Sequence, residues 1–64
     1  MEDREARELV WKLYQEGAKA MAAGWKYDPP DNVVLKRAYH AGYEDELNGA
    51  LLTMDEAMVL IFGV

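Results

Sequence analysis

Apolar residues in the first third of the chain recur with the period of an α-helix. At about 100° per residue, the apolar and small positions from Ala6 onward share one side of a helix, and most charged positions lie opposite. Gly24 is placed to end this helix, and the acids at positions 2, 3 and 5 suit the positive end of its dipole. The pattern predicts a helix from about residue 2 to about residue 23. Its apolar side consists of Leu9, Val10, Leu13, Tyr14, Gly17, Ala20, Met21 and Gly24.

The segment 27–32 cannot continue that helix, because it contains two consecutive prolines. Asp31 or Asn32 can then cap a second helix that starts near Val33. Glycine inside a helix costs about 1 kcal/mol relative to alanine, and a close backbone approach is the usual compensation. Small residues, at Gly17, Ala20 and Gly24 of the first helix and at Ala38 and Gly42 of the second, therefore predict that the two helices cross closely. The shared face of the second helix is Val34, Leu35, Ala38, Tyr39, Gly42 and Tyr43.

A third helix is predicted from Met54 to Phe62. Asn48-Gly49 interrupts the second helix, and Thr53 with Glu56 forms the pattern of a capping box. The run 57–62 is apolar on every side and on its own fits a buried strand equally well, but the capping box favours a helix. A helix buried all round needs two helices beneath it and something above it. Residues 1–64 are therefore expected to form a single all-α, three-helix domain.

The chain contains more hydrophobic residues than a domain of its size is expected to bury. Hydrophobic residues make up 52% of the 64 positions, whereas a domain of this size buries only about 60% of its extended-chain surface. Either the packing is unusually efficient or a partner covers the remainder. Interface hot spots are enriched in Trp and Tyr, and Trp11 lies at the edge of the first helix's apolar side. The aromatic residues predicted to contact a partner are Trp11, Tyr14, Trp25, Tyr39, Tyr43 and Phe62.

Charge is unevenly distributed along the chain. The net charge is −5, yet residues 1–37 are neutral and residues 38–64 hold five acids and no Lys or Arg. Such a cluster steers a protein toward a basic partner, so Glu44, Asp45 and Glu46 join the predicted partner contacts, with Asp55 and Glu56 as further steering charges. Direct nucleic-acid binding is not expected, because the bases form no patch.

Catalytic chemistry is poorly represented. The chain has no Cys and no Ser, which excludes a disulfide scaffold, a Cys-based zinc site and a Ser or Cys nucleophile. His40 is the only imidazole, and without a second histidine we interpret it as a solvated helix residue rather than as a base or a ligand. A hydrolase built from carboxylates would need a pocket that so short a chain hardly encloses. We expect no enzyme, no cofactor and no metal.

Two alternatives use the acidic cluster differently. The segment from Glu44 to Glu56 resembles an EF-hand calcium loop, in which Asn48 and Gly49 fit, but Asp55 stands where a bidentate Glu is expected. A calcium-responsive module is therefore one alternative. The second is a nucleic-acid mimic, in which the carboxylates imitate phosphates and occupy a basic groove of a DNA-binding protein.

The preferred hypothesis is a small cytoplasmic protein that acts through protein contacts. Its acidic start is unlike a secretory signal, and the longest apolar run is too short to span a bilayer, so neither export nor a membrane is expected. It would act as a homodimer, or as an adaptor or inhibitor that occludes a larger protein. In type, though not in any motif, it resembles the accessory proteins that bacteriophages and mobile elements encode to modulate host proteins.

Overall fold

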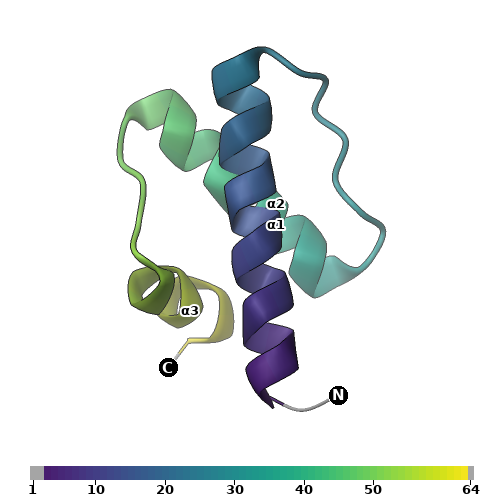
Figure 1. Cartoon of the computed structure of the whole chain (residues 1–64), viewed down its shortest axis with the longest axis vertical. Coiled ribbons are helices and arrows are strands. Elements are labelled where there is room, and N and C mark those ends of the chain that lie inside the picture. The colour runs from purple at the N-terminus through teal and green to yellow at the C-terminus, as the bar shows by residue number, and fades with distance from the viewer. Residues whose placement is uncertain (1–2, 64) are drawn as a thin grey trace.

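A computed structural model describes residues 3–63 as three helices connected by two extended segments (Figure 1). They are α1 (Asp3–Ala23), α2 (Val33–Asn48) and α3 (Met54–Phe62), and residues 3–63 contain no strand. The predicted all-α, three-helix architecture is confirmed, and α3 has the predicted bounds. Residue 2, where the first helix was expected to start, lies outside the described residues.

The ends of α1 and α2 follow from local sequence. Gly24 ends α1 with φ of 72°, in the left-handed region that glycine adopts without a steric cost. Asn32, rather than Asp31, caps α2. Its side-chain oxygen accepts hydrogen bonds from the N–H groups of Val34 at 2.9 Å and Leu35 at 3.1 Å. Each cap satisfies backbone groups that a helix end leaves unpaired.

The segment between α2 and α3 is also fixed at both ends. Gly49 ends α2 in the left-handed conformation, and the N–H of Ala50 donates to the carbonyl of Asp45 at 2.8 Å. At the start of α3, the predicted capping box is present: the Glu56 N–H donates to the Thr53 hydroxyl at 3.3 Å, and the Thr53 N–H donates to the Glu56 carboxylate at 3.1 Å. The connector 49–53 is therefore anchored where each helix begins or ends.

The main packing contact is the crossing of α1 and α2, where two glycines let the backbones meet. A Cβ atom at Gly17 would collide with the carbonyl oxygen of Tyr39, and one at Gly42 would collide with the carbonyl oxygen of Tyr14. In Figure 1, α2 passes behind α1 at a steep angle at this crossing. The predicted close approach is confirmed at Gly17 and Gly42, whereas Gly24 follows the end of α1 and has no atom within 4 Å of an added Cβ.

One hydrophobic core joins the three helices. All side chains in it are apolar or aromatic, and within residues 3–63 no buried side-chain polar atom lacks a hydrogen-bond partner. None of the helices in this part of the chain is both long and apolar enough to cross a membrane. The core consists of Val10, Leu13, Tyr14, Ala20, Ala38, Tyr39, Ala57, Met58 and Ile61.

The outer side of α3 differs from the prediction. Ala57, Met58 and Ile61 are buried against α1 and α2, but Val59 and Leu60 are exposed. The described chain measures 33 × 23 × 14 Å along its principal axes, and a helix with its side chains is about 10–12 Å across. Nothing among residues 3–63 covers this side, so α3 is not buried all round within the described chain.

Candidate protein-interaction surface

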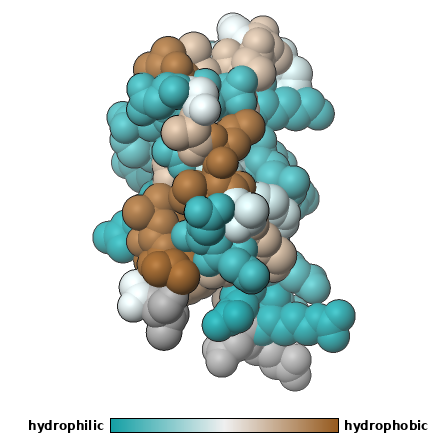
Figure 2. Space-filling model, turned by 90° about the vertical axis from the view of Figure 1, so that its left-hand side faces the viewer, coloured by the Kyte–Doolittle hydropathy of each residue, from teal (hydrophilic) through white to brown (hydrophobic). Residues whose placement is uncertain are grey.

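Exposed apolar side chains gather on the side of the molecule formed by the end of α2, the connector 49–53 and α3. These three segments lie on the same side in Figure 1, and Figure 2, which views that side, shows hydrophobic side chains over all of them. We call this surface the C-terminal apolar face and define it by five residues that are 40% to 61% exposed: Leu47, Leu51, Val59, Leu60 and Phe62.

A shallow apolar hollow adjoins Phe62. It has a volume of about 270 Å³ and lies between the first turns of α1, the start of α2 and the end of α3. Apart from Asn32, its lining is apolar: Ala6, Leu9, Val10, Val34, Leu35 and Phe62. Of the five residues that define the C-terminal apolar face, the hollow shares Phe62 alone.

Tyr14 connects this surface to the core. Its side chain is 1% exposed, and its hydroxyl donates to the Asp45 carboxylate at 2.6 Å and accepts from the Leu52 N–H at 2.9 Å. Burial, and next the hydrogen bond to Asp45, raise the pKa of Tyr14 from 10.0 to about 12. The Trp11 ring stacks on the Tyr14 ring at a centroid distance of 5.4 Å. One phenol thereby holds α2 and the connector that carries α3 against α1.

Three of the five C-terminal acids are engaged within the chain. Asp45 accepts from Tyr14, as described. Glu44 lies 3.0 Å from the Nε2 atom of His40 one turn earlier. Glu56 accepts from Thr53, and these hydrogen bonds lower the pKa of its carboxyl group. Asp45, which was predicted as a partner contact, is instead half-buried and bonded to the core tyrosine.

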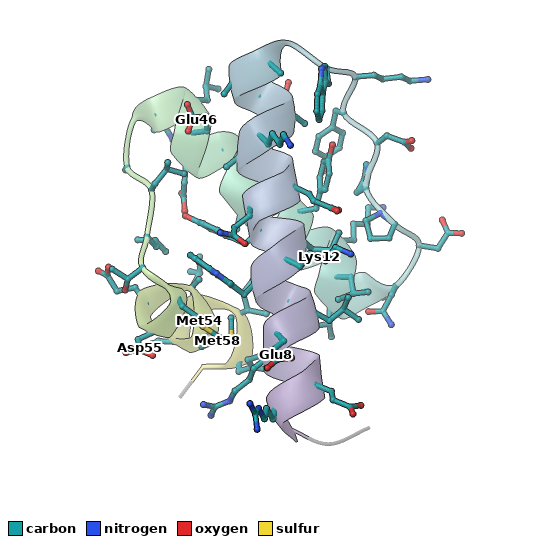
Figure 3. The ribbon with its side chains drawn as sticks, in the orientation of Figure 1. Glu8, Lys12, Glu46, Met54, Asp55 and Met58 are labelled. Carbon is teal, nitrogen blue, oxygen red and sulfur yellow. The ribbon has the colours of Figure 1, made fainter. Side chains whose placement is uncertain are left out.

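Glu46 and Asp55 are the other two acids. Neither carboxylate makes a hydrogen bond or ion pair with another side chain among residues 3–63. Figure 3 shows Glu46 near the end of α2 and Asp55 at the start of α3, on the side that carries the C-terminal apolar face. Glu46 belongs to α2, which runs on to Asn48. The two free acids flank the connector from opposite ends.

The predicted aromatic contacts are distributed between the core and two surfaces. Tyr14 and Tyr39 are core side chains, Tyr39 with 6% exposure, so the prediction that they contact a partner is corrected. Trp11 is half-buried over Tyr14. Trp25 is exposed beside Lys19, whose Nζ lies 5.6 Å from the ring, but it follows the end of α1, at the opposite end of the molecule from α3 (Figure 1).

Tyr43 and His40 form a separate cluster with the other connector. The Tyr27 ring contacts the Tyr43 ring at a centroid distance of 5.1 Å, and the Tyr27 hydroxyl lies 2.9 Å from Nδ1 of His40. His40 is exposed, as expected for a solvated helix residue, and also hydrogen-bonded. The Glu44, His40 and Tyr27 side chains form a line that fastens the segment 25–32 to α2, away from the C-terminal apolar face.

The calcium alternative does not fit the backbone. The first ligands of an EF-hand come from a loop that follows the entering helix and whose oxygens converge on one point, whereas the stretch from Glu44 to Asn48 is the last part of α2. Within residues 3–63, no three His, Asp or Glu side chains are grouped closely enough to hold a metal ion. The EF-hand resemblance is thus confined to the sequence.

Four residues of the C-terminal apolar face were not predicted as partner contacts: Leu47, Leu51, Val59 and Leu60. A signal for the two in α3 exists in the sequence, because a helix that is apolar on every side can bury only the side that faces its own core. Aromatic side chains were preferred as interface residues, and aliphatic ones were assigned to the interior.

Comparison with known proteins gives no assignment. No protein-family model, no curated protein and no solved structure matches the chain. Function therefore has to be inferred from the surface of the chain itself.

Proposed function

We propose that this protein is a protein-interaction module that binds its partner through the C-terminal apolar face. The observation that carries the proposal is the exposure of Val59 and Leu60 on α3, a helix whose opposite side is buried in the core. A contiguous exposed apolar surface bordered by polar residues is typical of a protein-binding site. Trp11 is half-buried and stacks on Tyr14, whose hydroxyl binds the connector at Leu52. Trp11 is therefore a candidate contact at the edge of the C-terminal apolar face.

The size of the face limits the affinity that apolar contact can supply. Full burial of a Val, Leu or Phe side chain contributes about 1.5–3 kcal/mol. Since the five residues are already about half-buried, they would add roughly 4–8 kcal/mol together. Association costs about 4–15 kcal/mol before any surplus appears as affinity. Apolar burial alone therefore gives a weak complex, and a tight one requires polar or charged contacts at the rim.

Comparison of two matched variants tests the proposal. Leu60→Gln places an amide in the C-terminal apolar face, and Val33→Gln does the same at an exposed valine at the start of α2, outside that face. We expect wild-type protein and Val33→Gln to capture the same protein from a lysate of the native host, and Leu60→Gln to lose it. Capture that survives Leu60→Gln, or that Val33→Gln abolishes equally, would contradict the proposal.

The more specific expectations from the sequence stay proposals: a cytoplasmic location, a homodimer, and inhibition of a host protein by occlusion in the manner of phage accessory proteins. Occlusion fits a face that lacks catalytic groups, because covering a partner's surface requires only complementary contact. The nucleic-acid-mimic alternative requires several free carboxylates in a row. It is less well supported, because Glu44, Asp45 and Glu56 are engaged within the chain.

A further inference from the structure

We infer that the segment which fits the C-terminal apolar face is an amphipathic helix of another protein, with Lys or Arg on both sides of its apolar stripe. This inference rests on the proposed function and specifies the chemistry of the partner. The inference follows from the charge around the face, from the length of its exposed helix α3 and from the lack of any β-strand among residues 3–63.

Charge favours a cationic partner. Residues 38–64 contain five acids and no Lys or Arg, so the basic side chains near this surface come from α1, where Arg4 and Arg7 line a hollow with Met54. Glu46 and Asp55 make no hydrogen bond or ion pair with another side chain among residues 3–63 and lie near the end of α2 and at the start of α3, at the two ends of the connector 49–53 (Figure 3). An apolar stripe placed between them would bring its flanking cations to these two carboxylates. Complementary rim charges of this kind increase the association rate and exclude anionic competitors.

Backbone geometry favours a helix over an extended peptide. An extended segment is usually held by the free edge of a β-sheet, and residues 3–63 contain no strand that could offer one. The exposed side of α3 is about 14 Å long, from nine residues at about 1.5 Å each. Two to three turns of a partner helix match this length and can place their side chains between those of α3, as packed helices do.

A second copy of this chain fits the face less well. A symmetric dimer places the same patch of both subunits in contact, so Glu46 and Asp55 of one protomer would approach the acids of its partner. Residues 38–64 offer no Lys or Arg to compensate them, and Arg4 and Arg7 of α1 approach α3 at Met54, beside Asp55 alone of the two acids. Like charges brought together at an interface are destabilising.

Three synthetic peptides test the inference by calorimetric titration and by NMR shift mapping. The first is an amphipathic peptide of Leu and Lys with its leucines on one helical face. The second has the same composition with the leucines scattered, and the third replaces every Lys with Glu. We expect the first to bind at least about tenfold more tightly than the other two, because it alone offers both an apolar stripe and positive charge. The largest shifts are expected at the amides of Leu51, Val59 and Leu60.

Matched variants separate the two contributions. Leu60→Gln should weaken binding of the amphipathic Leu/Lys peptide about tenfold. The double variant Glu46→Gln, Asp55→Asn should weaken it about three- to tenfold and flatten its salt dependence. Glu5→Gln with Glu16→Gln removes the same charge from exposed positions of α1 and should leave the affinity nearly unchanged.

The outcomes are distinct. If the scattered peptide binds as tightly as the first, net charge alone explains the binding. If the Leu/Glu peptide binds as tightly as the first, the sign of the peptide charge does not matter. Either result overturns the inference. A dimer in sedimentation that Leu60→Gln dissociates would assign the face to a second copy and overturn it as well. If Leu60→Gln abolishes capture of a native partner but no Leu/Lys peptide binds, the proposed function stands and the cationic-helix inference fails.

Discussion

Gly17 of α1 and Gly42 of α2 each face the backbone of the opposite helix, so that a methyl group at either position would overlap a carbonyl oxygen. The obstructing atoms belong to Tyr39 and Tyr14, whose side chains are in the core. The crossing that glycine permits therefore also fixes the two buried tyrosines.

Alanine at either glycine is expected to destabilise the fold. Gly17→Ala and Gly42→Ala should each cost at least about 2 kcal/mol of unfolding free energy, because the clash is with backbone atoms that cannot rotate away. Urea unfolding measures this. At exposed Gln15 of α1 the preference is reversed, and Gln15→Ala should be more stable than Gln15→Gly by about 1 kcal/mol. If alanine is favoured at all three positions, the close crossing is wrong.

Removal of one hydroxyl should loosen α3. Tyr14→Phe leaves the Leu52 N–H and the Asp45 carboxylate without their partner and is expected to cost about 1–3 kcal/mol. Tyr43→Phe is the control, since the Tyr43 hydroxyl makes no hydrogen bond to another residue within 3–63. Amide hydrogen exchange should accelerate in 52–62 in the first variant alone. Unchanged protection there would show that Tyr14 does not hold the connector.

The raised pKa of Tyr14 predicts that the folded protein loses stability at high pH. The pKa of Tyr14 is about 12 in the folded protein and 10.0 in the unfolded chain. The folded state therefore holds this proton more tightly, and the resulting stabilisation is complete below pH 10.0 and is lost as the pH rises to about 12. Ultraviolet titration should show one late tyrosine ionisation that Tyr14→Phe removes. If all wild-type ionisations persist in the variant, the assignment is wrong.

Acid should weaken the start of α3. The hydrogen bonds from Thr53 lower the pKa of Glu56 from 4.5, so their stabilisation is complete above pH 4.5 and is lost as the pH falls through the lowered value. Thr53→Ala should cost about 1 kcal/mol at neutral pH and less at about pH 3. Thermal unfolding of both proteins at the two pH values measures the difference. A pH-independent difference would mean that the Thr53 hydroxyl does not bond to the Glu56 carboxylate.

Local features of the fold were accessible from the sequence, and long-range ones were not. The proline pair and the capping box define helix ends through interactions within a few residues, and the glycines indicate a crossing because each lies on the apolar face of its own helix. By contrast, Tyr14 meets Asp45 and Leu52 across 31 and 38 positions. Helical periodicity indicates which face of a helix is apolar but not which neighbour covers it, and for this reason Tyr39 was predicted at the surface and Leu60 was not.

The central claim is that a partner protein contacts the exposed side of α3. A benzophenone amino acid at position 60, compared with the same group at position 33, tests it most directly, because Leu60 and Val33 are both large, apolar and exposed, at 55% and 73%. After irradiation in the native host, we predict a covalent adduct to one defined protein from position 60 and none from position 33. Equal adducts from both positions, or none from position 60, would contradict the claim.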